Sequence, residues 1–180
     1  EEIFNMLSHF MGTNFLVQFI LQPILIFGVI FHFVMGFYLE IENRKAKKYV
    51  YHKEMGGANS TWMSRNMIWS GLVVLSFLVL HFIDFWIPEM NYKYVEFLPE
   101  DPNRYYEELV HKFENMWRVI FYCISFILLA LHLLHGFSSA LKSMGTNKSY
   151  ASSIKNLSYI YSIGIPLGFC FIAIFHHLTH

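Results

Sequence analysis

Residues 119–141 read VIFYCISFILLALHLLHGFSSAL and contain no Asp, Glu, Lys or Arg. An α-helix rises about 1.5 Å per residue, so roughly 20 apolar residues cross a hydrocarbon core of about 30 Å. This stretch is long enough to span a membrane. Three further stretches without these charged residues occur in the chain, at 15–39, 67–83 and 156–180. The second is short, so we expect its helix to extend at both ends.

The composition agrees with a membrane protein. The chain is 55% hydrophobic and 14% charged, whereas about a quarter of the residues of a soluble domain are charged. The alternative of a buried soluble core would have to explain four charge-free stretches in 180 residues. We therefore predict an all-α fold, a single transmembrane domain over residues 1–180, with a lipid bilayer and no nucleic acid as its partner. The expected helices are about 15–41, 63–87, 116–141 and 155–178.

The loop charges predict an orientation. Residues 40–65 carry six basic and three acidic side chains, and residues 142–155 carry three basic and none acidic. Basic loops are enriched on the cytoplasmic side of membranes, so we place these two loops there. The opposite side carries Glu1, Glu2 and a long loop, 84–118, which together hold four basic and ten acidic residues. Within that loop, YYEELVHKF at 105–113 is a candidate for a short amphipathic helix at the interface.

Three histidines lie well inside the charge-free stretches: His32, His81 and His132, with His135 one helical turn beyond His132. Ionisable groups inside a membrane are costly and indicate function, and no acid lies in the four stretches to pair with them. Neutral imidazole is a strong axial ligand of haem iron, and two imidazoles leave no open position on the metal. This pattern favours electron transfer over oxygen chemistry. His135 is the rival of His132, because it lies on the same helix one turn away.

The three histidines are expected at different depths in the membrane. Counted from the charged cytoplasmic ends, His32 and His132 both lie roughly 12 to 15 Å deep, whereas His81 lies about 10 Å deeper. His32 and His132 can therefore share one haem, and His81 cannot join them. Each of the pair is followed four residues later by a glycine, Gly36 or Gly136, which leaves room for a porphyrin on the same helix face. Close helix packing is the ordinary alternative for these glycines.

Two other function classes stay open at this stage. One is a haem-free structural anchor, whose histidines bond to backbone or to partner helices. The other is a proton-coupled transporter that uses the membrane histidines, although transporters usually have acids or broken helices near the midplane. Absence of haem absorbance would favour either alternative.

The chain resembles a known family, the five-helix, di-haem cytochrome b anchor subunits of bacterial succinate:quinone oxidoreductases and quinol:fumarate reductases. The resemblance covers nearly the whole chain in family order. It rests on FMGTNFLVQ (10–18), FHFVMGFYLEIENRKAKKYVY (31–51), NSTWMSRNM (59–67), GLVVLSFLVLHFIDFW (71–86) and LHLLHGFSSALKSMG (131–145). Other di-haem quinone cytochromes, such as those of formate dehydrogenases and nitrate reductases, fit these ordered motifs less well.

The resemblance implies two haem b groups in the intact subunit. His32 and His132 would be the axial ligands of the inner haem, with Gly36 and Gly136 giving it clearance. His81 would bind the outer haem, and its partner ligand would come from a first helix that precedes Glu1. The implied partners are a flavoprotein, which carries the succinate chemistry, and an iron–sulfur subunit. The implied location is the bacterial cytoplasmic membrane, with His32 and His132 toward the cytoplasm.

The resemblance also implies a membrane quinone, expected to be menaquinone, near the outer haem. Asn14, Gln18, Asp84 and Trp86 are polar or amphipathic side chains at about that depth, and we take them as candidates for its site. In one respect the chain departs from the family pattern. Some members carry an acid two positions before the fourth-helix ligand, as part of a proton route, and Ala130 stands there. That proton route is therefore not expected here.

Overall fold

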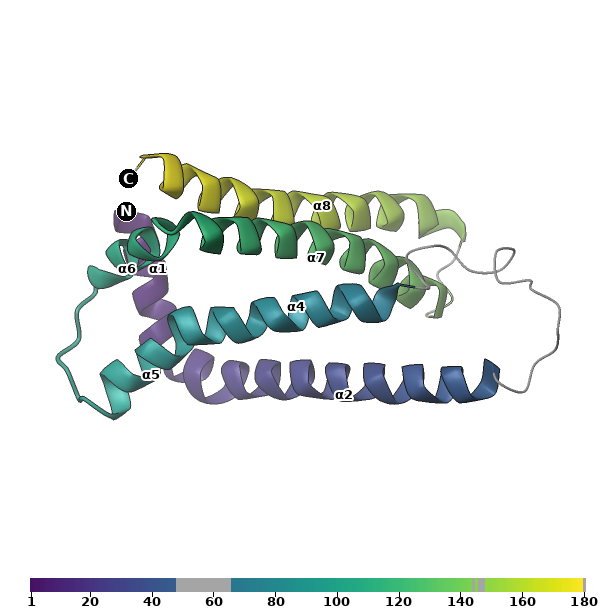
Figure 1. Ribbon diagram of the computed structural model, residues 1–180, viewed down its shortest axis with the longest axis horizontal. Coiled ribbons are helices and arrows are strands. Elements are labelled where there is room, and N and C mark those ends of the chain that lie inside the picture. Colours follow the sequence, from purple (N-terminus) through teal and green to yellow (C-terminus); the bar gives the residue numbers. More distant parts are fainter. Residues whose placement is uncertain (48–65, 144, 146–147, 180) are drawn as a thin grey trace. The chain divides into compact units, whose positions relative to one another are not determined.

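The computed structural model describes residues 1–47, 66–143, 145 and 148–179, and these form helices without any strand (Figure 1). The chain divides into two compact units. The first unit comprises residues 1–58 and 98–111, and the second comprises residues 59–97 and 112–180. Each unit is described on its own below.

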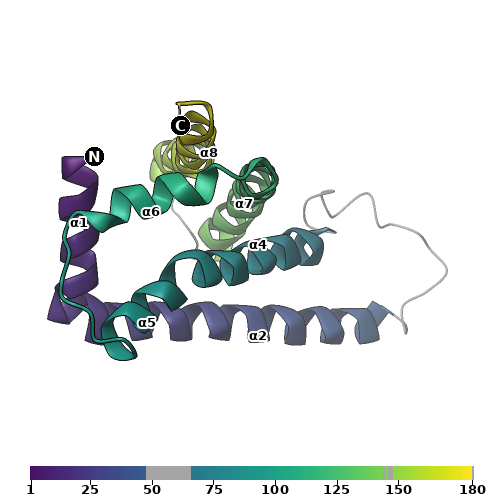
Figure 2. The same ribbon diagram turned by 60° about the vertical axis from the view of Figure 1, so that its left-hand side comes forward.

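In the first unit, two helices meet at a sharp corner. Helix α1 (Glu2–Thr13) ends at Asn14, and the π-helical turn η1 (Val17–Leu21) continues without a break into α2 (Gln22–Lys47). Asn14 has extended backbone angles, and its Oδ1 accepts hydrogen bonds from the amides of Leu16 (3.0 Å) and Val17 (3.3 Å). An Asn in this position caps the start of a helix. Asn14 thus turns the chain from α1 into the long α2, as Figure 2 shows.

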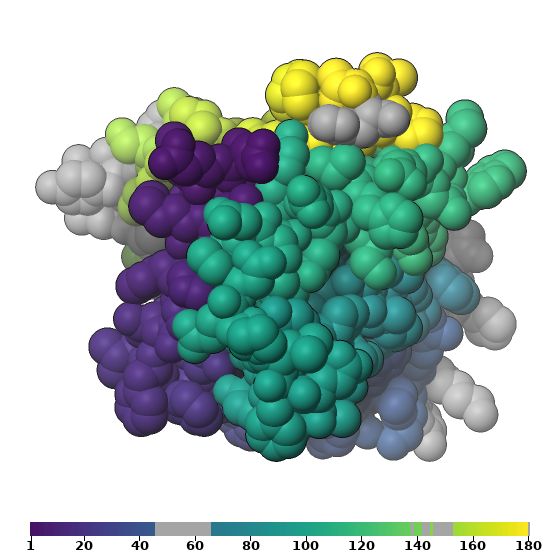
Figure 3. Space-filling model, turned by 90° about the vertical axis from the view of Figure 1, so that its left-hand side faces the viewer, coloured from purple at the N-terminus to yellow at the C-terminus, as the bar shows by residue number. Residues whose placement is uncertain are grey.

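Helix α6 (Arg104–Phe113) begins in the first unit, where its start is fastened to α1. Buried Asn5 donates from Nδ2 to the carbonyl of Asn103 (3.0 Å) and accepts at Oδ1 from the amide of Tyr106 (2.8 Å). The ring of Phe4 meets that of Tyr106 edge to face, with centroids 6.2 Å apart. Figure 3 shows the purple side chains of α1 against the teal ones of this segment. A helix is therefore confirmed over 105–113.

The second unit is built around α7 (Met116–Ser143), which contacts both α4 (Met67–His81) and α8 (Lys148–Thr179) (Figures 1 and 2). Helix α4 runs on through the π-helical turn η2 (Phe82–Trp86) into α5 (Ile87–Tyr94). Small buried residues lie on α7 and α8, among them Ser125, Ser162 and Ala173. Small residues let membrane helices approach closely, which explains why these two helices run side by side.

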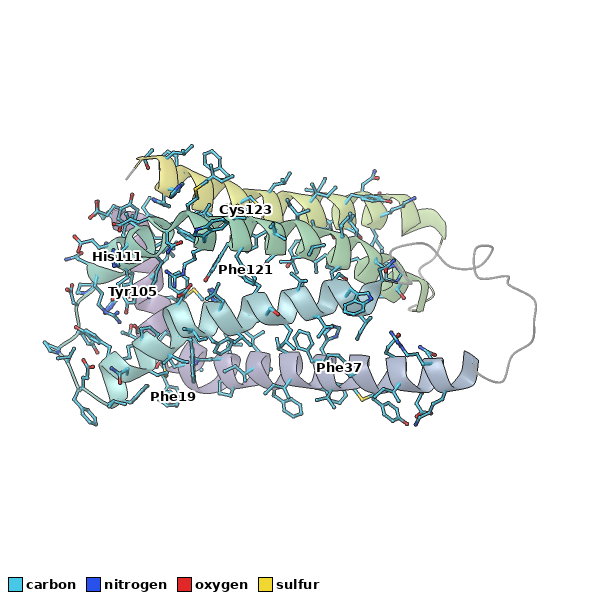
Figure 4. The ribbon with its side chains drawn as sticks, in the orientation of Figure 1. Phe19, Phe37, Tyr105, His111, Phe121 and Cys123 are labelled. Carbon is cyan, nitrogen blue, oxygen red and sulfur yellow. The ribbon has the colours of Figure 1, made fainter. Side chains whose placement is uncertain are left out.

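Sulfur atoms lie in the same α7–α8 packing. Cys123 lies on α7, where Figure 4 labels it, and the thiol of Cys170 on α8 donates to the Cys123 carbonyl at 3.7 Å. Both cysteines are free thiols. They behave as small packed side chains.

Four helical segments are long and apolar enough to cross a membrane: Val17–Lys45, Met67–Tyr94, Met116–Leu141 and Ser153–Thr179. The predicted all-α transmembrane fold is thereby confirmed, and the chain is a multi-pass membrane protein. The large apolar side chains of α2, such as Ile24, Leu25 and Phe27, are exposed. Such side chains are suited to contact lipid or partner helices rather than water.

The second span differs from the sequence expectation at its far end. Its expected start, residues 63–65, lies outside the described residues. Its far end is Tyr94, about two turns beyond the expected position 87. Asp84, where the expected helix 63–87 overlaps the outer loop 84–118, lies inside this continuous helix. The helix accommodates its carboxylate by pairing it, as described below.

Each π-helical turn is followed, after one intervening residue, by a proline. The amide of Gln22 bonds to the carbonyl of Val17, and that of Ile87 bonds to Phe82, each one residue further back than in an α-helix. Pro23 and Pro88 follow these amides and have no N–H to donate to the carbonyl four residues earlier. The wider turn is one way for a helix to accommodate such a break, and π-turns are frequent at functional sites.

Candidate functional site

His132 lies on the side of α7 that faces α4. Its Nδ1 is 3.2 Å from Ser70 Oγ, and the same hydroxyl donates to the Met67 carbonyl at 2.9 Å. A Cβ built on Gly71 would lie 3.6 Å from His132 Cε1. The imidazole therefore rests against the backbone of α4 at a position where that helix carries no side chain.

A shallow groove of about 220 Å³ lies beside this contact. It is lined by Asn66, Met67, Trp69, Ser70, Val73, Leu128 and Leu131. Except for Asn66 and Ser70, these residues are apolar or aromatic. The surroundings of His132 thus suit a flat, apolar group better than a hydrated ion.

His81 lies at the end of α4, directly before η2. Its ring is exposed and is flanked by Phe77 and Phe85, with centroids 5.8 and 5.2 Å away. Because His132 contacts Ser70, and Ser70 precedes His81 by about three helical turns, the two histidines are separated by about 16 Å along α4. Two imidazoles on one iron lie at one level, so these two belong to different sites. The separation exceeds the 10 Å expected from depth alone.

His32 lies on α2 in the first unit, exposed, with its ring 6.0 Å from that of Phe33. Gly36 follows one turn later on the same face. A Cβ added at Gly36, or at Gly136 on α7, would meet nothing within 4 Å among the described residues. Both glycines therefore border open space, as the clearance hypothesis requires. His32 and His132 belong to different units, so their pairing on one iron stays a prediction.

Next to His81, the second unit holds a buried ionic cluster that the sequence did not predict. The side chain of Asp84 is 1% exposed, and its Oδ2 accepts from the Tyr122 hydroxyl at 2.9 Å and from Arg118 Nε at 3.0 Å. Tyr122 and Arg118 both come from α7. The cluster therefore joins η2 to α7 one turn beyond His81. The sequence does contain a signal for this cluster. Asp84 and Arg118 carry opposite charges and stand at the two ends of the segment 84–118, which connects the second and third charge-free stretches.

The four quinone candidates have mostly intrachain roles. Asn14 caps the helix after α1, and Gln18 Nε2 donates to the carbonyl of Gly12. Asp84 is engaged by the cluster described above. Trp86 packs on Phe82, with centroids 5.3 Å apart, and is partly exposed. Asn14 and Gln18 belong to the first unit and Asp84 and Trp86 to the second, so a shared quinone site stays a prediction.

The sequence has three histidines near its C-terminal end: His176, His177 and His180. His177 Nδ1 is 2.9 Å from the carbonyl of Phe113 and can donate a hydrogen bond to it. His176 is buried beside the ring of Phe175. His180 lies outside the described residues. His177 therefore serves to hold the end of α8 on the end of α6.

The basic residues proposed for the cytoplasmic face are only partly described. Arg44 pairs with Glu40 at 2.7 Å on the exposed surface of α2. Lys48 and Arg65 lie outside the described residues. The pair at Arg44 contributes little to stability, because exposed ion pairs are worth about 0 to 1 kcal/mol.

His132 and its neighbours in the second unit are suited to binding a haem. His132 presents an imidazole with one nitrogen bonded to a hydroxyl, packed on a glycine and beside an apolar groove. Metal-bound histidines commonly have their second nitrogen held by such a hydrogen bond. Among the described residues no three His, Cys, Asp or Glu side chains gather to hold a bare ion. An imidazole held at one nitrogen by a hydrogen bond is suited to axial ligation of haem iron.

Comparison with protein-family models, with curated proteins and with solved structures gave no match to this chain.

Proposed function

We propose that the chain is the membrane anchor and haem-containing electron conduit of a bacterial succinate dehydrogenase or fumarate reductase. It would carry electrons between an iron–sulfur subunit and a membrane quinone. The succinate chemistry would take place on a partner flavoprotein. The proposal places the protein in the bacterial cytoplasmic membrane, with His32 and His132 toward the cytoplasm.

One observation carries the proposal: two histidines of one unit lie inside apolar membrane spans at levels about 16 Å apart. One of them, His132, is oriented by a hydroxyl and rests on a glycine. Two separate levels are what a chain of two haems across a membrane needs. The ordered sequence motifs supply the specific family.

Haem b, held by imidazoles, supplies one-electron chemistry with no open position for oxygen. In this chain His132 would hold the inner group, with His32 as its expected second ligand. His81 would hold the outer group together with a histidine from outside residues 1–180. Gly36, Gly71 and Gly136 leave space for close approach, and the apolar side chains of the spans keep water away.

The buried Asp84 bears on the transporter alternative. The four charge-free stretches contain no acid, but the span Met67–Tyr94 includes Asp84 and Glu89. A proton-coupled transporter would use such a residue. Asp84 is paired with Arg118 and Tyr122, however, and a carboxylate stabilised in this way is a weaker candidate for proton transport.

The deciding experiment is optical spectroscopy of the purified complex with single histidine substitutions. We expect reduced-minus-oxidised spectra with the α-band of haem b in the native protein. His132→Leu is expected to remove one spectral component and His81→Leu a different one. His111→Leu is the matched control, because His111 lies on α6 outside the four spans. A native complex without haem absorbance would leave the structural anchor or the transporter.

A further inference from the structure

Ser70 has one hydroxyl proton and two close neighbours. The Met67 carbonyl, 2.9 Å away, can only accept a hydrogen bond. The second neighbour, His132 Nδ1, lies 3.2 Å away and can either donate or accept. When the hydroxyl proton goes to Met67, the bond to His132 requires that Nδ1 carries the imidazole proton.

This donor count has a consequence for the other nitrogen of the ring. A neutral imidazole protonated at Nδ1 carries its lone pair on Nε2. The lone pair is what an iron atom binds. The Cε1 edge of the ring is the one near Gly71, since a Cβ added there would lie 3.6 Å from Cε1.

We infer that Ser70 is the positioning residue that holds His132 as the Nδ1–H tautomer and presents Nε2 to the inner haem iron. The inference rests on the proposed function, because it concerns a ligand of that haem. It adds a residue that the histidine pattern does not contain. A hydrogen bond from Nδ1, the nitrogen that does not face the iron, also makes the imidazole a more basic ligand.

The sequence offers a matched pair of serines on one helix. Ser76 lies on α4 and donates to the Leu72 carbonyl at 3.0 Å, which resembles the bond from Ser70 to Met67. Ser76 is exposed, and among the described residues its hydroxyl makes no hydrogen bond to a histidine. Replacing Ser76 therefore tests loss of a helix-bound hydroxyl alone.

The experiment compares Ser70→Ala, Ser70→Thr and Ser76→Ala in the purified complex. Haem affinity is measured by transfer to apomyoglobin, and the midpoint potential of the His132-dependent haem by redox titration. Losing the bond to a metal-bound histidine typically costs 10- to 100-fold in metal affinity, so Ser70→Ala is expected to release haem about tenfold more readily. Its midpoint potential should rise, because a less basic ligand stabilises ferric iron less well.

The outcomes separate the two proposals. Ser70→Thr keeps a hydroxyl and should return both readouts toward the native values, while Ser76→Ala should leave both unchanged. If Ser70→Ala matches Ser76→Ala in a complex that does contain haem, the role of Ser70 is refuted and the electron-conduit function stands. If the native complex contains no haem, the proposed function itself fails. Far-ultraviolet circular dichroism confirms that each variant keeps its helices.

Discussion

Gly71 shows what a single missing side chain does in this protein. It lies where the imidazole of His132 crosses α4, and a Cβ at this position would have an ordinary contact of 3.6 Å with Cε1. One carbon therefore fits, whereas a branched side chain would displace the ring. The same residue is also next to Ser70, so a displaced ring would lose its hydrogen bond.

We predict that Gly71→Ala keeps the His132-dependent haem and that Gly71→Leu loses most of it, to the extent seen with His132→Leu. The measurement is haem per protein from the optical spectrum. Gly164→Leu is the control, because Gly164 lies in a membrane span and a Cβ there meets nothing within 4 Å among the described residues. Equal haem content in Gly71→Leu and Gly164→Leu would contradict this packing.

Sequence reasoning at this scale identified histidines and missed their neighbours. His32, His81 and His132 stand out because ionisable groups are rare inside membrane spans. Ser70 and Gly71 do not stand out, since small and hydroxyl residues are common in such helices. Their role depends on how α4 and α7 are rotated and shifted against each other. That shift also explains why the separation of His81 and His132 was underestimated.

At the scale of helices, the cluster of Asp84, Tyr122 and Arg118 fastens the far end of α4 to α7. A carboxylate that is almost fully buried would be costly without partners, and it has two. The π-turn η2 places Asp84 in the segment just before Pro88. The helix can therefore continue to Tyr94 through an acidic residue that directly follows the charge-free stretch 67–83.

We predict that Asp84→Ala destabilises the protein by about 3 kcal/mol, since removing one partner of a buried ion pair typically costs about 3–5 kcal/mol and Arg118 remains partly exposed. Thermal unfolding in detergent can be followed by the reaction of Cys123 and Cys170 with a thiol-reactive fluorophore. Glu40→Gln, which breaks the exposed pair with Arg44, serves as control and should change stability by less than about 1 kcal/mol. Similar unfolding temperatures for both variants would refute a stabilising role of the cluster of Asp84, Tyr122 and Arg118.

The ends of the helices were harder to predict from the sequence than the helices themselves. The four spans were predictable from the absence of charge, and the helix over 105–113 from its alternating polar and apolar faces. The extension of the second span from 87 to Tyr94 was not predictable from the absence of charge, because this part contains Glu89 and Lys93. The structure shows that these two residues pair with each other one helical turn apart.

At the scale of the whole molecule, the chain has four membrane spans, and His81 and His132 lie at separate levels in two of them. The membrane character follows from length and composition alone and is seen in the helices. The charge asymmetry of the loops predicts which end lies in the cytoplasm. The assignment to a succinate dehydrogenase or fumarate reductase rests on the ordered motifs, and its cofactor content is the property that can be measured most directly.

The decisive measurement is the number of haem b groups per copy of this polypeptide in the purified intact complex, from the reduced pyridine spectrum and quantitative amino-acid analysis. The account predicts two, one dependent on His132 and one dependent on His81. A single haem would contradict the two separate levels, and no haem would contradict the electron-conduit function altogether.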